Sequence, residues 1–125
     1  MRLFYLVAAM FAAGSVAWAA KAQVLFFVST DCPISNSFAP EIQRICRDYA
    51  AKGVGCSLVY EDFQVDAAAV HKHLAEYGYD RIPATIDADR HVAANAHATI
   101  TPQAVVIDQQ LLRGTRQTPP GGNGA

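Results

Sequence analysis

Apolar residues are grouped along the chain in short runs, separated by longer segments of mixed polarity. Two of these runs, 23–29 (QVLFFVS) and 54–60 (VGCSLVY), are rich in β-branched and aromatic residues, which is typical of strands buried on both faces. The run 103–107 (QAVVI) has the same character and predicts a third strand. Shorter extended pieces are expected at 82–86 and 111–113.

The segment after the first strand has helical spacing. Apolar residues recur every three or four positions from Phe38 to Tyr49, which predicts a helix over 35–51 with one apolar face. Pro40 lies inside this pattern. Because proline lacks a backbone N–H and its ring collides with the preceding turn, we expect a kink there.

Two further helices complete the expected order of elements. The first covers 66–77, with Asp66 as its N-cap and Gly78 as its closing residue, and the second covers 87–97. Strands that alternate with helices predict an α/β domain. We expect a mainly parallel central sheet with flanking helices and a C-terminal antiparallel hairpin.

The first 19 residues have the features of an export signal. A basic residue, Arg2, precedes an uncharged apolar run, and Ala17 and Ala19 supply the small-x-small pattern of a cleavage site. We expect cleavage after Ala19 and an extracytoplasmic location, periplasmic or secreted. The alternative is a membrane anchor formed by residues 3–20, which are just long enough to span a bilayer.

The remaining chain divides into a domain and a tail. Residues 20–113 hold all the predicted strands and helices and form one domain. Residues 114–125 (GTRQTPPGGNGA) are rich in Gly and Pro, carry no apolar face and are expected to be disordered.

Charge argues against a nucleic-acid partner. The chain has 10 basic and 11 acidic residues, and the basic ones are scattered singly instead of forming a basic face. No metal or other cofactor is expected. His71 and His73 are two positions apart on a predicted helix, on different faces, and are expected to be solvated or partly buried. A copper or zinc site of Cys32 with His97 is the weaker alternative.

The chain has three cysteines. In an oxidising compartment an odd count leaves one free thiol or an intermolecular bond. Cys46 lies roughly 20 Å from Cys32 along the same predicted helix, at 1.5 Å per residue, so these two are not expected to pair. Cys46 and Cys56 flank the turn between helix and strand and are candidates for a structural disulfide. Two reduced core cysteines are the alternative.

Cys32 directly follows the first predicted strand and precedes the first predicted helix. A thiol beside the free amides at a helix N-terminus is favoured in its thiolate form, which is the nucleophile. Reacting groups also gather at the carboxyl ends of strands in parallel sheets. The alternative is a small apolar side chain that fills space at the strand end. The polar residues on both sides of Cys32 favour an exposed, reactive thiol.

The segments FFVSTDCPIS and ITPQAVVID, with Pro40 between them, resemble the thioredoxin-like redoxins over about residues 24–108. That group includes extracytoplasmic thiol–disulfide proteins and the peroxiredoxin-related alkyl hydroperoxide reductase/thiol-specific antioxidant proteins. The resemblance implies a catalytic Cys32 and a cis proline at Pro102, preceded by Thr101. It implies substrate contacts at Pro33, Thr101 and Pro102. Its substrates would be protein or small-molecule thiols and disulfides, with an external reductant.

The chain departs from the usual dithiol motif at Ser35, where a second cysteine would resolve the mixed disulfide. Ser35 is expected to cap the helix or to donate a hydrogen bond to the Cys32 thiolate. Monothiol chemistry remains open to such a site. We therefore predict a thiol–disulfide exchange protein that uses Cys32 alone.

Two alternatives stay open. The first is a peroxiredoxin-like peroxidase: Ser29 matches the hydroxyl position three residues before the cysteine, but Leu25 stands where peroxiredoxins carry proline. Peroxide reduction also needs a cation near the sulfur, for which Arg81 and Arg113 are the candidates. The second alternative is a non-catalytic thioredoxin-fold module that binds proteins through its Thr101 edge.

The C-terminal part departs from the family as well. Members of the family continue past the hairpin with a strand and a helix that covers the sheet, whereas the apolar pattern here stops at Leu112. We expect a thioredoxin-like fold that lacks this last helix. One sheet face would be partly open or completed by a partner.

Overall fold

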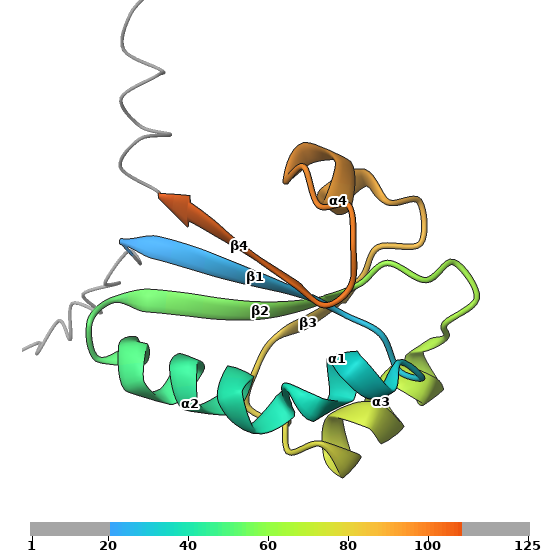
Figure 1. Cartoon of the computed structure of the whole chain (residues 1–125), viewed down its shortest axis with the longest axis horizontal. Coiled ribbons are helices and arrows are strands. Elements are labelled where there is room, and N and C mark those ends of the chain that lie inside the picture. The colour runs from blue at the N-terminus through green and yellow to red at the C-terminus, as the bar shows by residue number, and fades with distance from the viewer. Residues whose placement is uncertain (1–20, 109–125) are drawn as a thin grey trace, which may run out of the picture.

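The computed structural model describes residues 21–108 of the chain. A four-stranded sheet forms its centre, with strand order β3-β2-β1-β4 (Figure 1). The elements in chain order are β1 (Ala22–Val28), α1 (Pro33–Ser37), α2 (Ala39–Ala50), β2 (Val54–Tyr60), α3 (Ala67–Glu76), β3 (Ala84–Ile86), α4 (His91–Asn95) and β4 (Gln103–Asp108).

The sheet is mixed. β1 pairs in parallel with β2, and β2 pairs in parallel with β3, whereas β4 runs antiparallel to β1. Phe26 illustrates the register, because it lies opposite Leu58 on one side and Ala104 on the other. The α/β architecture expected from the sequence is confirmed. The partner strand expected at 111–113 for a C-terminal hairpin lies outside the described residues.

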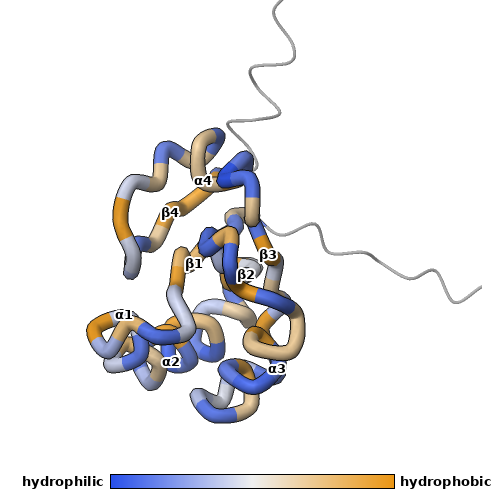
Figure 2. The backbone as a smooth tube through the Cα atoms, turned by 90° about the vertical axis from the view of Figure 1, so that its right-hand side faces the viewer, coloured by the Kyte–Doolittle hydropathy of each residue, from blue (hydrophilic) through white to orange (hydrophobic). Residues whose placement is uncertain are grey.

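Each face of the sheet carries its own apolar core, which explains the continuous apolar runs in β1 and β2. α2 and α3 pack on the face that presents Val24, Phe26, Val28 and their neighbours in β2. α4 packs on the other face, where Phe27 and Val59 are buried. Figure 1 shows α1, α2 and α3 on one side of the sheet and α4 on the other. In Figure 2 the strands lie as an apolar layer between these groups.

The helix expected over 35–51 is two helices in the structure. α1 ends at Ser37 and α2 begins at Ala39, with Phe38 between them. Pro40 explains the break, because it has no N–H for the carbonyl of Asn36 and its ring crowds that carbonyl. The Phe38 N–H bonds to the Ser35 carbonyl at 3.2 Å, in a tighter turn than an α-helix makes.

α3 has the ends expected from the sequence. The Asp66 side chain accepts a hydrogen bond from the Ala69 N–H at 2.8 Å, which caps the helix. Gly78, with φ of 71°, follows the helix in the left-handed conformation that glycine adopts without strain.

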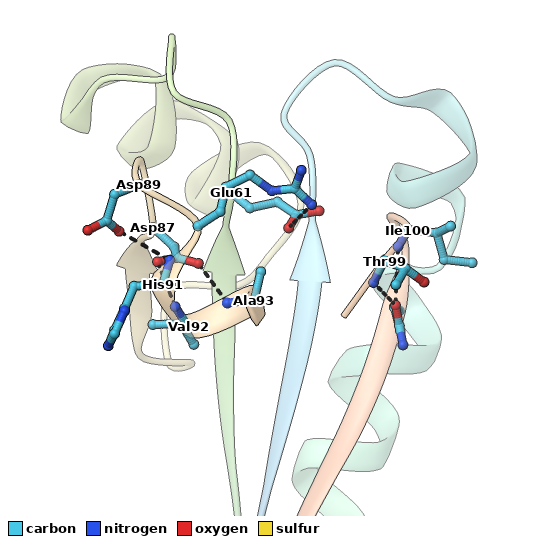
Figure 3. Close-up of polar contacts among 10 residues, drawn as sticks. Glu61, Asp87, Asp89, His91, Val92, Ala93, Thr99 and Ile100 are labelled. Atoms are coloured by element: carbon cyan, nitrogen blue, oxygen red, sulfur yellow. Dashed lines mark hydrogen bonds and ion pairs between the residues drawn. The ribbon is translucent and has the colours of Figure 1, made fainter. Parts of the chain in front are cut away.

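α4 is shorter than the helix expected over 87–97. It begins only at His91, because the preceding Arg90 has φ of 57° and cannot be helical. Asp87 caps the helix from a distance: its carboxylate accepts from the N–H groups of Val92 and Ala93 at 3.0 and 2.9 Å (Figure 3). The acidic residue therefore marks the helix start without belonging to the helix.

The α2-side face of β4 is not covered by any helix among residues 21–108. Val106 is 68% exposed and Ala104 is also exposed. The sheet is thus open along this strand in the described part of the chain.

Several sequence expectations concern residues that the structure does not describe: the export signal at 1–19, the tail at 114–125 and Arg113. Within residues 21–108, no helix is long and apolar enough to cross a bilayer.

Candidate functional site

Cys32 lies at the junction between the central strand and the first helix. It is the N-cap residue of α1, with extended backbone (φ −90°, ψ 111°), and its carbonyl accepts the Asn36 N–H at 2.9 Å. Pro33 follows at the first helical position, where its missing N–H costs nothing. Cys32 is in no disulfide and is half-buried.

The other two cysteines are bonded to each other. Cys46 on α2 and Cys56 on β2 form a disulfide, with their Cα atoms 5.8 Å apart. Both pack against the core on the face of the sheet that α2 and α3 cover. Cys32 is therefore the one free thiol in the described part of the chain, and neither of the other sulfurs is free to resolve its adducts.

Ser35 is turned inward. It is 1% exposed, and its hydroxyl accepts a hydrogen bond from the Ser29 backbone N–H at 3.2 Å. It is not the cap of α1, because Cys32 occupies that position and no side chain caps the helix. The expectation that Ser35 caps the helix is wrong, because the helix starts two residues earlier than expected.

Ser29 is the last residue before the Cys32 loop. Its hydroxyl donates to the Asp31 carboxylate at 3.0 Å, and its N–H is held by Ser35. The structure thus joins Ser29 to Ser35 across the loop that carries Cys32. This bond helps to hold the loop in place.

Thr101 and Pro102 lie at the same end of the sheet as Cys32, the end at which β1 finishes. β1 and β4 are antiparallel with Phe27 opposite Gln103, so the end of β1 meets the start of β4. The Thr101–Pro102 peptide bond is cis. An apolar cavity of about 260 Å³ adjoins this end of the sheet, lined by both Pro102 and Phe38.

Gln103 shapes the chain that leads into Pro102. Its side-chain Oε1 accepts hydrogen bonds from the N–H groups of Thr99 and Ile100, at 2.8 and 3.2 Å (Figure 3). These bonds fix the turn before Pro102 and leave Ile100 65% exposed. Ile100 is thus an exposed apolar side chain in the loop that leads to Pro102.

A second, charged cavity of about 310 Å³ lies on the other side of this end of the sheet, bordered by Ser29 and Thr101. Arg90 and Glu61 also line it and form an ion pair of 3.3 Å (Figure 3). Sequence reasoning missed both residues, because neither belongs to a motif. Arg81 instead lines a separate cavity beside Cys46, so the structure does not place it among the residues around Ser29.

His73 is another residue that the sequence did not single out for the site. It is 3% exposed, whereas His71 is exposed on the opposite side of α3. Burial lowers the pKa of His73, and the charge of Glu76 opposes this only in part. The spacing of Val70, His73 and Tyr77 on one helix face was the available signal. His73 contacts Asn36 on α1, which brings it into connection with the Cys32 loop.

No protein-family model matches the chain, and no curated protein matches it. Solved structures do. An uncharacterized conserved protein from Geobacillus kaustophilus is 26% identical, with a TM-score of 0.66 over 74% of this chain and 51% of its own. The chain therefore spans about half the length of that protein.

Two further structures carry functional names. A putative thiol:disulfide interchange protein DsbE from Chlorobium tepidum is 18% identical, with a TM-score of 0.62 over 74% of this chain and 63% of its own. A secreted disulfide oxidoreductase from Mycobacterium tuberculosis, described as homologous to E. coli DsbE, is 18% identical, with a TM-score of 0.58 over 78% and 81% of the two chains. The sheet, the flanking helices and these likenesses establish a thioredoxin-like fold.

Proposed function

We propose that the protein is a thioredoxin-like thiol–disulfide exchange protein that works through Cys32 alone. The observation that carries the proposal is the placement of a free, half-buried thiol at the N-cap of α1, at the end of the sheet where Thr101 and Pro102 lie. The disulfide between the other two cysteines supports it, because Cys32 is then the free nucleophilic sulfur.

The reaction follows from ordinary thiol–disulfide chemistry. The Cys32 thiolate attacks one sulfur of a substrate disulfide, the substrate S–S bond breaks, and the other sulfur leaves as a thiolate that takes a proton from water. The product is a mixed disulfide on Cys32. Because Ser35 has no sulfur, an external thiol must attack this mixed disulfide and regenerate Cys32.

The neighbours of known name give independent support. One is named as a thiol:disulfide interchange protein and another as a disulfide oxidoreductase. Their sequence identities to this chain are low, so the chemistry of the site carries the argument. We propose Pro33, Thr101 and Pro102 as the residues that contact the substrate.

We also propose that the protein works outside the cytoplasm. The signal-like first 19 residues and a structural disulfide both fit an oxidising compartment. The Mycobacterium tuberculosis neighbour is described as secreted. Edman sequencing of protein exported from a bacterial host tests this, and we expect an N-terminus at Ala20.

Incubation with oxidised glutathione tests the exchange activity. We expect mass spectrometry of the intact protein to find one glutathione per chain, and peptide mapping to place it on Cys32. Cys32→Ser must abolish the adduct, and added dithiothreitol must release it. A wild-type protein that stays unmodified would refute the proposal and favour the non-catalytic binding module. Rapid oxidation of Cys32 to sulfenic acid by stoichiometric peroxide would favour the peroxidase.

A further inference from the structure

A chain of hydrogen bonds runs from the buried core to the Cys32 loop. The Tyr60 hydroxyl lies 2.8 Å from His73 Nδ1, and His73 Nε2 lies 2.7 Å from Asn36 Oδ1. Asn36 Nδ2 donates in turn to the carbonyl of Thr30 at 3.2 Å. This series of hydrogen bonds therefore connects the end of β2, α3 and α1 to the loop that carries Cys32.

The acceptor at the end of the chain fixes its direction. The Thr30 carbonyl can only accept, so Asn36 turns its amide nitrogen toward Thr30 and its oxygen toward His73. That oxygen can only accept as well, so Nε2 of His73 carries the ring proton. Nδ1 of the neutral ring is then left to accept from the Tyr60 hydroxyl, and every group in the chain has a partner.

The surroundings of His73 favour this neutral ring. Burial lowers its pKa, while Glu76 on its own helix has a weaker opposite effect. The other titratable groups that face it are tyrosines: Tyr60 from β2, Tyr77 with ring centroids 4.6 Å apart, and Tyr79 at 5.9 Å. No cation competes for the Tyr60 hydroxyl among these neighbours.

Asn36 holds the backbone on both sides of Asp31. Its side chain binds the carbonyl of Thr30, and its backbone N–H binds the carbonyl of Cys32 at 2.9 Å. Only the side-chain bond depends on which residue stands at position 36. The side chain is itself held by His73 from α3.

We propose that Asn36 and His73 are positioning residues for Cys32: their hydrogen-bond chain fixes the loop in the geometry in which the thiol reacts. The inference rests on the exchange function proposed above and extends it to two residues outside the Cys-x-x-Ser motif. His73 acts through Asn36 and needs only a donor at the place of Nε2.

The test compares substitutions by the rate of mixed-disulfide formation with oxidised glutathione. Asn36→Ala removes the bond to the loop, and His73→Asn removes the donor that holds the Asn36 side chain. Each should slow the reaction about tenfold, within the known cost of misplacing a reacting group. His73→Gln should restore most of the rate, because the glutamine amide nitrogen reaches the place of Nε2. Asn95→Ala is the matched control: it breaks an exposed Asn–His contact of 3.2 Å on α4 and should change nothing.

The double variant Asn36→Ala/His73→Asn sharpens the test. If both residues act through one chain, it should react no more slowly than the slower single variant. Losses that multiply, or a His73→Gln variant as slow as His73→Asn, would overturn the inference. If His73→Asn does not fold, the rate of mixed-disulfide formation by Asn36→Ala still decides, because a rate equal to that of wild type would overturn the inference.

Amide hydrogen exchange gives a readout that does not depend on redox activity. The N–H of residue 36 bonds to the Cys32 carbonyl, and this backbone bond stays closed only while the loop is held in place. Its protection should therefore fall when the loop loosens in Asn36→Ala and His73→Asn, and persist in His73→Gln. Unchanged protection in all variants would refute the positioning role. If the wild-type protein formed no mixed disulfide while the variants showed these protection changes, the exchange function alone would be refuted.

Discussion

The Ser35 hydroxyl accepts a hydrogen bond from the Ser29 backbone N–H at 3.2 Å. Ser35 stands where a dithiol protein carries its second cysteine, and here it is buried and ties the start of α1 to the end of β1. Ser35 therefore has a structural role. Cys32 keeps its half-buried place at the helix start without a neighbouring sulfur.

Ser35→Cys should restore the missing resolving step. A thiol at this position can attack the bond between Cys32 and glutathione, because two cysteines separated by two residues at a helix start are within bonding reach. Protein glutathionylated on Cys32 and freed of reductant should lose the adduct and gain a disulfide between Cys32 and the introduced cysteine, which mass spectrometry detects. Ser35→Ala is the control and should keep the adduct, as wild type does. Retention of glutathione by the cysteine variant would contradict the expectation.

Removal of the Cys46–Cys56 disulfide should destabilise the fold. The bond closes a short loop between α2 and β2 and limits the freedom of the unfolded chain. The double variant Cys46→Ala/Cys56→Ala should lose about 2–4 kcal/mol in the free energy of unfolding, measured by urea denaturation. Cys32→Ser should leave the urea midpoint nearly unchanged, because Cys32 is in no disulfide. Equal stabilities of the double variant and wild type would show that the bond is dispensable.

Acid should weaken the fold through His73. Its folded pKa lies below the ordinary value of 6.5, so the unfolded chain binds the proton more readily. The contribution of His73 to stability is complete above pH 6.5 and is lost as the pH falls below 6.5 toward the folded pKa. The urea midpoint should therefore drop between pH 7 and pH 5. His73→Gln should show a smaller drop, whereas His71→Gln, at an exposed position, should behave as wild type.

Asp87 should stabilise the segment around α4. Burial alone would raise the pKa of its carboxyl, but hydrogen bonds from the backbone N–H groups of Val92 and Ala93 outweigh this and hold the pKa below its ordinary value. Asp87→Ala leaves both donors without their acceptor and should cost about 1–2 kcal/mol of unfolding free energy. Asp89→Ala, at an exposed position, should cost less. If the two variants were equally stable, the capping role of Asp87 would be wrong.

Much of the fold was predictable from local patterns. The apolar runs of β1 and β2 are buried on both faces, so their composition alone indicated strands, and Pro40 indicated the break between α1 and α2. The start of α4 was predicted four residues too early, because the capping carboxylate of Asp87 lies four residues before the helix and reaches its N–H groups through space. No local pattern reports a cap of that kind.

The site was predictable only in part. Cys32 stands at a strand end and a helix start, which sequence spacing reveals. The contact between Ser35 and Ser29 depends on how the loop folds back, and the ion pair of Arg90 with Glu61 joins residues far apart in the chain. Such contacts exist only once the sheet has assembled, so no motif records them.

The pairing of Cys46 with Cys56 also sets how many partners the protein can hold. With three cysteines in the chain and two of them bonded to each other, one sulfur is left to form an adduct. Under the exchange function proposed above, the protein would be monovalent: it would carry a single substrate at a time and could not link two substrates through its own thiols. Each cycle of that reaction would then release one thiol equivalent, and every cycle would need a second molecule to free Cys32.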